Sequence, residues 1–414
     1  MALEGRRMLY ICYFGVQEPL VQTQVLPYLR ELAAAGLNVN LLSFEPQLSE
    51  RWSEHQLNLQ REQMGAEGIS WFYLPYHKSP TVPATIYDII AGARFAVQLA
   101  KRAGIDVLHA RAHVPMAMAL WARRFVRVKL VFDIRGLMAD EYADAGIWSA
   151  RSVTFRLVKR LERAGIRRAD HIIVLTERLR EWLIAHQLKP ASQIQVIPCC
   201  VDFERFAETG RHAKDASQRL SSDRFEVVYA GSLIGLYLVE EMGRFFAAIK
   251  RLRPEAFLRI LSMSPPENAI AALKRAGLNR SDFEIGPVSP EDIPAYLRRA
   301  RLGVSFRKPT FAQIGASPTK VPEYLAAGLP VVCNAGIGDT DEIVERERVG
   351  TILRKFDDDA YQTAAAEALV LTDDVDVRSR CERVAHQYFD LQTVGGPKYV
   401  NVYRQLFTGS SGHE

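Results

Sequence analysis

The stretch Ala316–Gly338, which reads ASPTKVPEYLAAGLPVVCNAGIG, carries the most information about the fold of this chain. Its tripeptide Ser317–Thr319 has the composition of a helix start, where free backbone N–H groups favour a phosphate. Lys320 adds positive charge in the first turn, and Glu323 follows one turn later on the same helix face. The stretch therefore predicts a diphosphate and ribose site between two strands. The alternative for Lys320 and Glu323 is a surface ion pair at helical spacing.

Outward from this stretch, short β-branched runs alternate with segments of helical period, which predicts parallel sheets built from βαβ units. Expected strands in the first half are Met8–Phe14, Asn38–Phe44, Ile69–Leu74, Asp106–His109, Lys129–Ile134, His171–Leu175 and Gln193–Ile197. Expected strands in the second half are Phe225–Ala230, Phe257–Ser262, Gly303–Phe306, Pro330–Cys333 and Gly350–Leu353. The fold class is therefore α/β, with two Rossmann-like doubly wound domains facing across a cleft.

The chain has 414 residues, more than one hydrophobic core usually supports, which agrees with two domains. We expect an N-terminal domain over 1–205 and a C-terminal domain over 224–385. Between them, residues 206–223 form a polar stretch typical of a linker. Residues 386–414 favour a long C-terminal helix, a candidate for crossing back to the first domain.

Hydrophobic residues make up 48% of the chain and charged residues 24%, which is ordinary for a soluble globular enzyme. The most apolar window, Ala84–Ala100, contains Asp88 and Arg94, so it is not expected to span a membrane. The first residues resemble a buried strand more than a signal peptide, and we expect a cytoplasmic protein. The five cysteines lack CxxC spacing and indicate buried thiols rather than disulfides or a zinc site.

The net charge of +5 is concentrated in the first half of the chain. Residues 151–168 contain seven basic side chains and a single acidic one, and their apolar residues recur at helical spacing. Such a basic amphipathic helix suits an anionic membrane surface. The alternative is a solvated helix face packed on a sheet. We expect no nucleic-acid partner, because no nucleic-acid module is present.

The stretch Ala316–Gly338 strongly resembles the donor-binding motif of glycosyltransferase family 4, retaining enzymes that share the GT-B fold. The likeness covers nearly the whole chain. Four further segments resemble the branch of that family that builds bacterial surface polysaccharides: DVLHAR at 106–111, VFDIRGLMADE at 131–141, IVLTE at 173–177 and VIPCCVDFERF at 196–206.

This resemblance implies a retaining hexosyltransferase that moves a sugar from a UDP- or GDP-linked donor to a glycan or lipid-diphosphate-linked acceptor. The basic first domain favours a peripheral location at the inner face of the plasma membrane. Lysine, arginine and helix N-termini offset the leaving diphosphate in this fold, so we expect no metal and no cofactor. The acidic runs at 339–341 and 357–359 are then loop and helix-start residues. Expected donor-binding residues are Gly231, Ser232, Arg307, Ser317, Thr319, Lys320 and Glu323.

The donor motif departs from the family pattern at two places. The family usually has two glutamates separated by seven residues; Glu323 matches the second, but Gly315 occupies the first position. The family's Arg…Lys diphosphate clamp is also absent after the first strand of the second domain, where no lysine occurs until Lys250. Lys320, with Arg307 or Lys308, would then supply the charge.

Candidate catalytic residues are Arg111, His113, His109 and Lys320. Many relatives place a histidine near the reacting sugar two residues beyond the position of His109, where this chain has Arg111 and then His113. For both histidines the alternative is a structural group at a strand end. Candidate acceptor-binding residues are Gly15, Asp133, Arg135, Asp140 and Glu141. For the four charged residues the alternative is a local salt-bridge loop.

Two other functions remain open from the sequence. A nucleotide-sugar epimerase of the same fold would convert the donor alone. A non-catalytic nucleotide-sugar-binding protein would bind without turnover, and Gly315 together with the missing clamp makes that alternative relevant.

Overall fold

The computed structural model describes residues 3–207 and 224–408. From residue 208 onward, the expected linker over 206–223 lies outside this range. The described residues divide into two compact units, 3–198 with 391–408 and 199–207 with 224–390. Residues 199–205, expected in the first domain, belong to the second unit. Their place there is fixed by Val201, whose N–H donates to the Phe389 carbonyl at 2.7 Å.

The first unit contains a seven-stranded parallel sheet in the order β3-β2-β1-β4-β5-β6-β7 within the described residues. Its strands are β1 (Arg7–Ile11), β2 (Asn38–Pro46), β3 (Ile69–Tyr76), β4 (Val107–Arg111), β5 (Lys129–Asp133), β6 (His171–Val174) and β7 (Ile194–Val196). The order reverses between β1 and β4, as in doubly wound sheets. The predicted α/β fold is confirmed for this unit, with strand ends shifted by a few residues.

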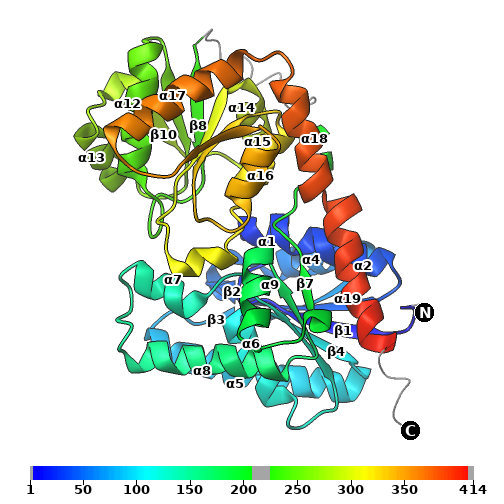
Figure 1. Cartoon of the computed structure of the whole chain (residues 1–414). Helices are drawn as coiled ribbons and strands as arrows, with labels where there is room; N and C mark the ends of the chain where they lie inside the picture. Colours follow the sequence, from blue (N-terminus) through cyan, green and yellow to red (C-terminus); the bar gives the residue numbers. More distant parts are fainter. Residues whose placement is uncertain (1–2, 208–223, 409–414) are drawn as a thin grey trace. The chain divides into compact units, whose positions relative to one another are not determined.

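Helices cover both faces of this sheet (Figure 1). They are α1 (Pro19–Gln24), α2 (Leu26–Ala34), α3 (Leu48–Arg51), α4 (Glu54–Ala66), α5 (Thr81–Ala103), α6 (His113–Ala122), α7 (Met138–Asp144), α8 (Val153–Arg168), α9 (Glu177–Ala185) and α19 (Gly396–Thr408). Helices α5, α6 and α8 form one layer, in which α6 packs against both neighbours. Among the described helices, none is long and apolar enough to cross a membrane.

The C-terminal segment is two helices rather than the single long one expected. Helix α18 (Val377–Phe389) ends before a π-helical turn over Leu391–Gly395, and α19 then begins at Gly396. Helix α19 packs on α2, where the rings of Tyr399 and Tyr28 lie 4.6 Å apart. Gly396 permits this approach, because a Cβ there would meet the Glu31 side chain at 2.8 Å. The last helix is thus part of the first unit.

The second unit contains a six-stranded parallel sheet in the order β10-β9-β8-β11-β12-β13 in the part of the chain described. Its strands are β8 (Glu226–Ala230), β9 (Phe257–Leu261), β10 (Phe283–Gly286), β11 (Leu302–Ser305), β12 (Val331–Asn334) and β13 (Gly350–Leu353). Its helices are α10 (Glu204–Ala207), α12 (Val239–Leu252), α13 (Glu267–Arg275), α14 (Ile293–Arg299), α15 (Lys320–Ala326), α16 (Thr340–Arg346), α17 (Asp358–Asp373) and α18. The edge strand β10 was not expected, because FEIG is short and ends in glycine.

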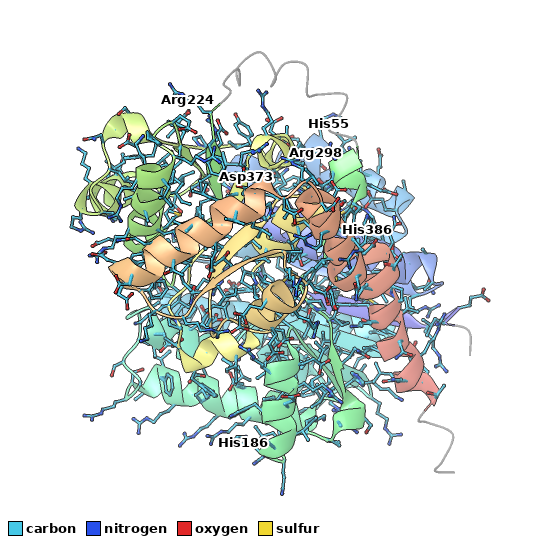
Figure 2. The ribbon with its side chains drawn as sticks, turned by 45° about the horizontal axis from the view of Figure 1, so that its top comes forward. His55, His186, Arg224, Arg298, Asp373 and His386 are labelled. Atoms are coloured by element: carbon cyan, nitrogen blue, oxygen red, sulfur yellow. The ribbon has the colours of Figure 1, made fainter. Side chains whose placement is uncertain are left out.

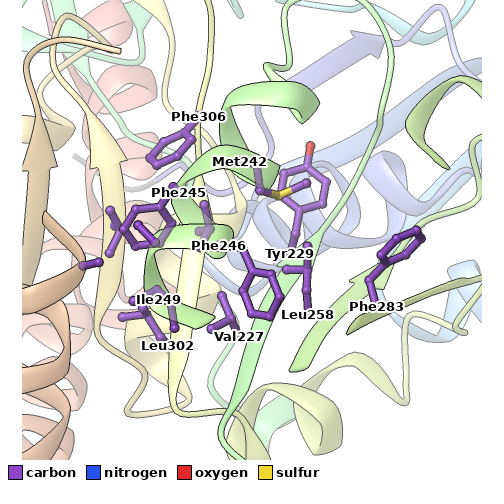
Figure 3. Packing of buried hydrophobic residues seen from close by; sticks show 14 of the residues in the cluster. Val227, Tyr229, Met242, Phe245, Phe246, Ile249, Leu258, Phe283, Leu302 and Phe306 are labelled. Carbon is purple, nitrogen blue, oxygen red and sulfur yellow. The ribbon is translucent and has the colours of Figure 1, made fainter. Parts of the chain in front are cut away.

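The core of the second unit is aromatic. Phe245 and Phe246 of α12 are fully buried and pack toward β8, β9 and β11 (Figure 3). Charged side chains such as Asp373, which pairs with Arg253 at 3.1 Å, lie on the outside (Figure 2). The apolar side chains fill the core and charged side chains cover the outside, so the polar candidate site lies at the carboxyl ends of the strands.

Candidate active site

Lys320 opens α15 beside the carboxyl end of β8, in the second unit. Its Nζ lies 3.1 Å from the hydroxyl oxygen of Tyr229. A Cβ built on Gly231 would lie 3.2 Å from the same nitrogen, and the φ of Gly231 is +132°. Glycine at 231 therefore satisfies a backbone conformation that other residues rarely adopt, and it leaves room for the lysine.

Two tyrosine rings surround the Lys320 ammonium. Nζ lies 4.2 Å from the ring centroid of Tyr229 and 4.0 Å from that of Tyr237, distances at which the ring quadrupole attracts a cation. Lys320 is only 4% exposed, and no carboxylate lies within ion-pair distance of it in the described part of the chain. Burial, reinforced by the charge of Arg307, lowers the pKa of Lys320 well below its ordinary value.

Arg307 lies in the segment that follows β11, and its guanidinium group contacts the Tyr237 ring that also faces Lys320. Its guanidinium carbon lies 5.1 Å from the Tyr237 ring centroid. Its Nε donates to Gln313 Oε1 at 2.7 Å, and its backbone N–H donates to Asn334 Oδ1 at 2.8 Å. The fold thus brings Arg307 and Lys320, two expected donor-binding cations, against one ring.

Glu323 lies one turn beyond Lys320 but does not pair with it. Its nearest cation is Arg205, with 3.6 Å between Nη1 and Oε1, and 17% of its side chain is exposed. Burial raises the pKa of Glu323, although Arg205 and Lys320 act in the opposite direction. This carboxyl group is held by an arginine and remains accessible at one edge.

The other expected donor residues form the surrounding turns. Ser317 Oγ accepts the backbone N–H of Cys199 at 3.1 Å, and Ser232 Oγ accepts that of Ile234 at 3.3 Å. Thr319 is the residue before α15, but its side chain does not cap the helix. Gly315 is buried at the end of a 3-10 turn over Phe311–Gly315.

His109 is enclosed in the core of the first unit. Its side chain is fully buried in β4, with Nδ1 2.8 Å from the Tyr403 hydroxyl and its ring stacked on that of Tyr399. Burial lowers the pKa of His109, so the ring is neutral at pH 7. Its Nε2 lies 3.8 Å from Asp133, beyond hydrogen-bond distance. This environment favours the structural alternative for His109.

Asp133 ends β5, and hydrogen-bond donors from several elements of the first unit surround its carboxylate. Its Oδ2 accepts the hydroxyl of Tyr399 at 2.8 Å, and Arg111 lies at 3.5 Å. Its Oδ1 lies 3.4 Å from Arg135. Burial alone would raise the pKa of Asp133, but the charges of Arg135 and Arg111 hold it below its usual range. The carboxylate is therefore ionised, and it fixes two expected site arginines.

His113 begins a second chain of polar groups, which runs from the buried pair His113 and Glu162 to the partly exposed Lys159 and Asp140. Its Nε2 lies 2.9 Å from Glu162, which pairs with Lys159 at 2.5 Å, and Lys159 also pairs with Asp140 at 2.7 Å. Between Arg111 and His113, Ala112 has φ +66° and ψ −171°, a conformation that is essentially restricted to glycine. Such strain is found mainly at functional sites.

Gly15 packs closely against Glu45, and Glu141 packs closely against Gly136. A Cβ on Gly15 would meet Glu45 Oε2 at 2.9 Å, and a Cβ on Gly136 would meet Glu141 Oε1 at 2.6 Å. Glu45 itself is buried at the end of β2 and accepts the backbone N–H of Val16 at 2.9 Å. Close packing against Gly15 and Gly136 restricts the positions of the Glu45 and Glu141 carboxyl groups.

The acidic runs near the second sheet are engaged by backbone N–H groups. Asp357 accepts the N–H of Ala360 at 2.9 Å and caps α17. Asp341 accepts the N–H groups of Gly336 and Glu342 at 2.9 and 3.0 Å. These are the loop and helix-start roles that the sequence indicated.

Two family models match the chain, one in each half. Residues 21–205 match Glycosyltransferase Family 4, and residues 224–371 match Glycosyl transferases group 1. The chain belongs to these glycosyltransferases. None of the curated proteins matches it in sequence.

Solved structures share the fold of this glycosyltransferase at low sequence identity. A sucrose-phosphate synthase from Thermosynechococcus elongatus is 18% identical, with a TM-score of 0.71, over 98% of this chain and 100% of that one. Anabaena HepE in complex with UDP-glucose is 15% identical, with a TM-score of 0.64, over 97% and 99%. A UDP-GlcNAc 2-epimerase from Neisseria meningitidis is 10% identical, with a TM-score of 0.60, over 97% and 100%. The GT-B fold is confirmed.

Several residues of the candidate site had no signal in the sequence. Tyr229 and Tyr237 enclose Lys320, and Gln313 orients Arg307. A tyrosine within a strand pattern indicates only a core position, and an isolated glutamine indicates nothing. Only the sheet order places them beside the lysine.

Proposed function

We propose that this glycosyltransferase is a retaining, metal-independent hexosyltransferase that uses a UDP- or GDP-sugar donor. Its acceptor is a glycan or a lipid-diphosphate-linked saccharide in bacterial surface-polysaccharide synthesis. The observation that carries the donor proposal is Lys320, a buried lysine beside Arg307 with no carboxylate partner in the described residues. Burial of an unpaired cation is costly, and a bound diphosphate would remove that cost.

Lys320 and Arg307 would neutralise the departing diphosphate in place of the family's missing clamp. Both lie against Tyr237, so their spacing is set before a ligand arrives. Pre-set charges stabilise a leaving group more strongly than mobile ones. Because these residues can supply the charge, the proposed reaction requires no metal.

Glu323 would bind the ribose hydroxyls of the donor. Its carboxyl group is partly exposed and paired with Arg205, so it can accept hydrogen bonds without losing its own position. UDP-glucose and UDP-GlcNAc complexes of structural neighbours support a nucleotide sugar as the donor class. Gly315 replaces the usual donor-sugar carboxylate, so sugar selection must come from other groups.

The acceptor would bind at the carboxyl ends of β4 and β5. Arg111 and Arg135 are held there by the ionised Asp133, and His113 lies at the start of α6 on the same edge. In the retaining reaction, the departing phosphate would accept the proton of the incoming hydroxyl on the same face of the sugar. The roles of Arg111 and His113 would be to position that hydroxyl.

Helix α8 supports a peripheral location at the cytoplasmic face of an anionic membrane. Val153 and Leu157 are 63% and 55% exposed, and Arg156, Arg160 and Arg163 are exposed on the same helix. Exposed apolar and basic side chains on one helix are typical of interfacial binding.

The test is a panel of UDP-, GDP- and dTDP-sugars, with nucleotide binding and nucleotide release followed together, with and without lipid-linked acceptors. Release that increases with acceptor and is lost in Lys320→Ala supports the proposal, and Lys274→Ala, an exposed lysine on α13, serves as the matched control. Binding without release under all conditions would indicate the non-catalytic alternative.

The likeness to a UDP-GlcNAc 2-epimerase favours a second candidate, an epimerase acting on the donor alone. The same panel distinguishes it. NMR spectra of the sugar nucleotides after incubation without acceptor would contain an epimerised product only if this candidate is right.

A further inference from the structure

A cavity of about 440 Å³ lies in the first unit, at the carboxyl ends of β2 and β3. The two strands end side by side, with Pro46 opposite Tyr76. Tyr76 and His77 form part of the wall, and Trp52 and Gln47 line the cavity from the segment after β2. Ligands of parallel sheets bind at the carboxyl ends of strands, and this volume is in the range of roughly 300–1,000 Å³ found for small-molecule sites.

His77 is held in one orientation by a buried carboxylate. Its Nδ1 lies 2.6 Å from Oδ1 of Asp88, which is 1% exposed, and its backbone N–H donates to Asp88 Oδ2 at 3.0 Å. Tyr13 donates to the same Oδ2 at 2.7 Å. Among the described residues Nε2 of His77 has no hydrogen-bond partner, and 42% of the side chain is exposed.

Gln47 forms the turn between β2 and α3 (Leu48–Arg51) at the rim of the cavity. Its φ of +51° is in the left-handed region, which is uncommon for a glutamine. Its carbonyl accepts the N–H groups of Glu50 and Arg51, and its side-chain amide donates to Glu50 at 2.9 Å. These bonds hold the short helix α3 over the cavity.

The lining offers no permanent cation to an anionic ligand, because none of the residues that line the cavity is a lysine or an arginine. Its apolar wall combines the aromatic rings of Trp52 and Tyr76 with the side chains of Leu48, Leu57 and Pro75, and its polar groups are uncharged amide and hydroxyl groups together with the His77 imidazole. An aromatic wall with a few fixed hydrogen-bonding groups matches a sugar ring, which has apolar C–H faces and a rim of hydroxyls.

We propose that this cavity, here named the β2–β3 cavity, is a saccharide subsite that binds an uncharged sugar residue of the acceptor. Tyr76 would stack on the sugar face, while His77 Nε2 and the Gln47 amide would bond its hydroxyls. The assignment to the acceptor rests on the proposed function, because a glycosyltransferase needs a saccharide acceptor site separate from its donor site. The cavity would therefore contribute to acceptor selection without contacting the reacting atoms.

The test measures binding of the full chain to an array of immobilised bacterial oligosaccharides, with no donor present. Ser49→Trp fills the cavity from its exposed rim, and we expect it to abolish binding. His77→Ala should weaken binding by about tenfold, the loss expected for one well-placed hydrogen bond. The matched control is His55→Trp, an exposed position on α4 outside the cavity (Figure 2), which should leave binding unchanged.

Nucleotide-sugar binding, measured on the same proteins, separates the two proposals. Retained donor binding with no oligosaccharide bound, or with oligosaccharide binding unaffected by Ser49→Trp, would overturn the subsite and leave the proposed function intact. Oligosaccharide binding that Ser49→Trp removes supports the subsite, whether or not donor binds. Absence of donor binding in all proteins would overturn the proposed function and, with it, the assignment of the saccharide to an acceptor, while the saccharide subsite itself would stand.

Discussion

The hydroxyl of Tyr399 donates a 2.8 Å hydrogen bond to the buried carboxylate of Asp133, joining residues 266 positions apart. Tyr399 lies on the last helix, α19, and Asp133 ends β5 and holds Arg111 and Arg135. The terminal helix thus completes the support of the candidate acceptor site.

Tyr399→Phe should lower the free energy of unfolding by about 1.5–3 kcal/mol, because a buried carboxylate loses a hydrogen-bond donor. Tyr28→Phe is the matched control: its hydroxyl donates to the neutral carbonyl of Pro198, so its loss should cost less. Urea unfolding of the three proteins measures both values. Equal losses in the two variants would contradict a special role for the Asp133 bond.

Lys320→Met should leave the ligand-free protein at least as stable as the parent, because it replaces a buried unpaired cation with an apolar chain of similar length. The pH dependence should also change. The folded-state pKa of Lys320 is lowered, so between that pKa and its ordinary value of about 10.4 the unfolded chain binds more protons and parent stability rises with pH. That rise should be smaller in Lys320→Met, as followed by urea unfolding at several pH values.

Binding of UDP should be coupled to proton uptake at pH values near and above the lowered pKa of Lys320. A diphosphate beside Lys320 favours the ammonium form that burial disfavours, so up to about one proton should be taken up per site. Calorimetric titrations in two buffers of different ionisation enthalpy measure this number. Identical binding enthalpies in both buffers would mean that Lys320 is already charged before the ligand binds.

Ala112→Gly should stabilise the protein, because Ala112 has a backbone conformation that costs of order 1–3 kcal/mol for a residue with a Cβ. Part of this gain is offset by the greater entropy of the unfolded glycine chain. Ala119→Gly, within α6, should instead destabilise. Thermal unfolding distinguishes the two, and a loss of stability in Ala112→Gly would argue that the Ala112 methyl makes necessary contacts.

Charge reversal on α8, with Arg156, Arg160 and Arg163 all replaced by Glu, should weaken sedimentation with vesicles that contain anionic lipid. Each basic residue near such a surface contributes about 1 kcal/mol. Vesicles of zwitterionic lipid serve as the control and should bind neither protein strongly. Equal binding of parent and variant to anionic vesicles would assign α8 to the solvated alternative.

Much of the fold followed from local pattern. The twelve strands expected from β-branched runs are all present, because a buried parallel strand needs a continuous apolar segment whatever its neighbours are. The edge strand β10 and the break between α18 and α19 were missed. Both depend on weak local preferences that packing overrides, as at Gly396, where the close approach of Glu31 requires a glycine.

The candidate site, like the fold, could be predicted from the sequence only in part. By itself, the sequence determined the parallel α/β architecture, the glycosyltransferase motif and the position of Lys320, because helix starts, glycines and apolar periods act over a few residues. Only the tertiary structure decided that Lys320 lies between Tyr229 and Tyr237, that Tyr399 holds Asp133, and that Trp52 and Tyr76 share a cavity. The partners come from separate strands and helices, and their meeting depends on sheet order and packing rather than on neighbouring residues.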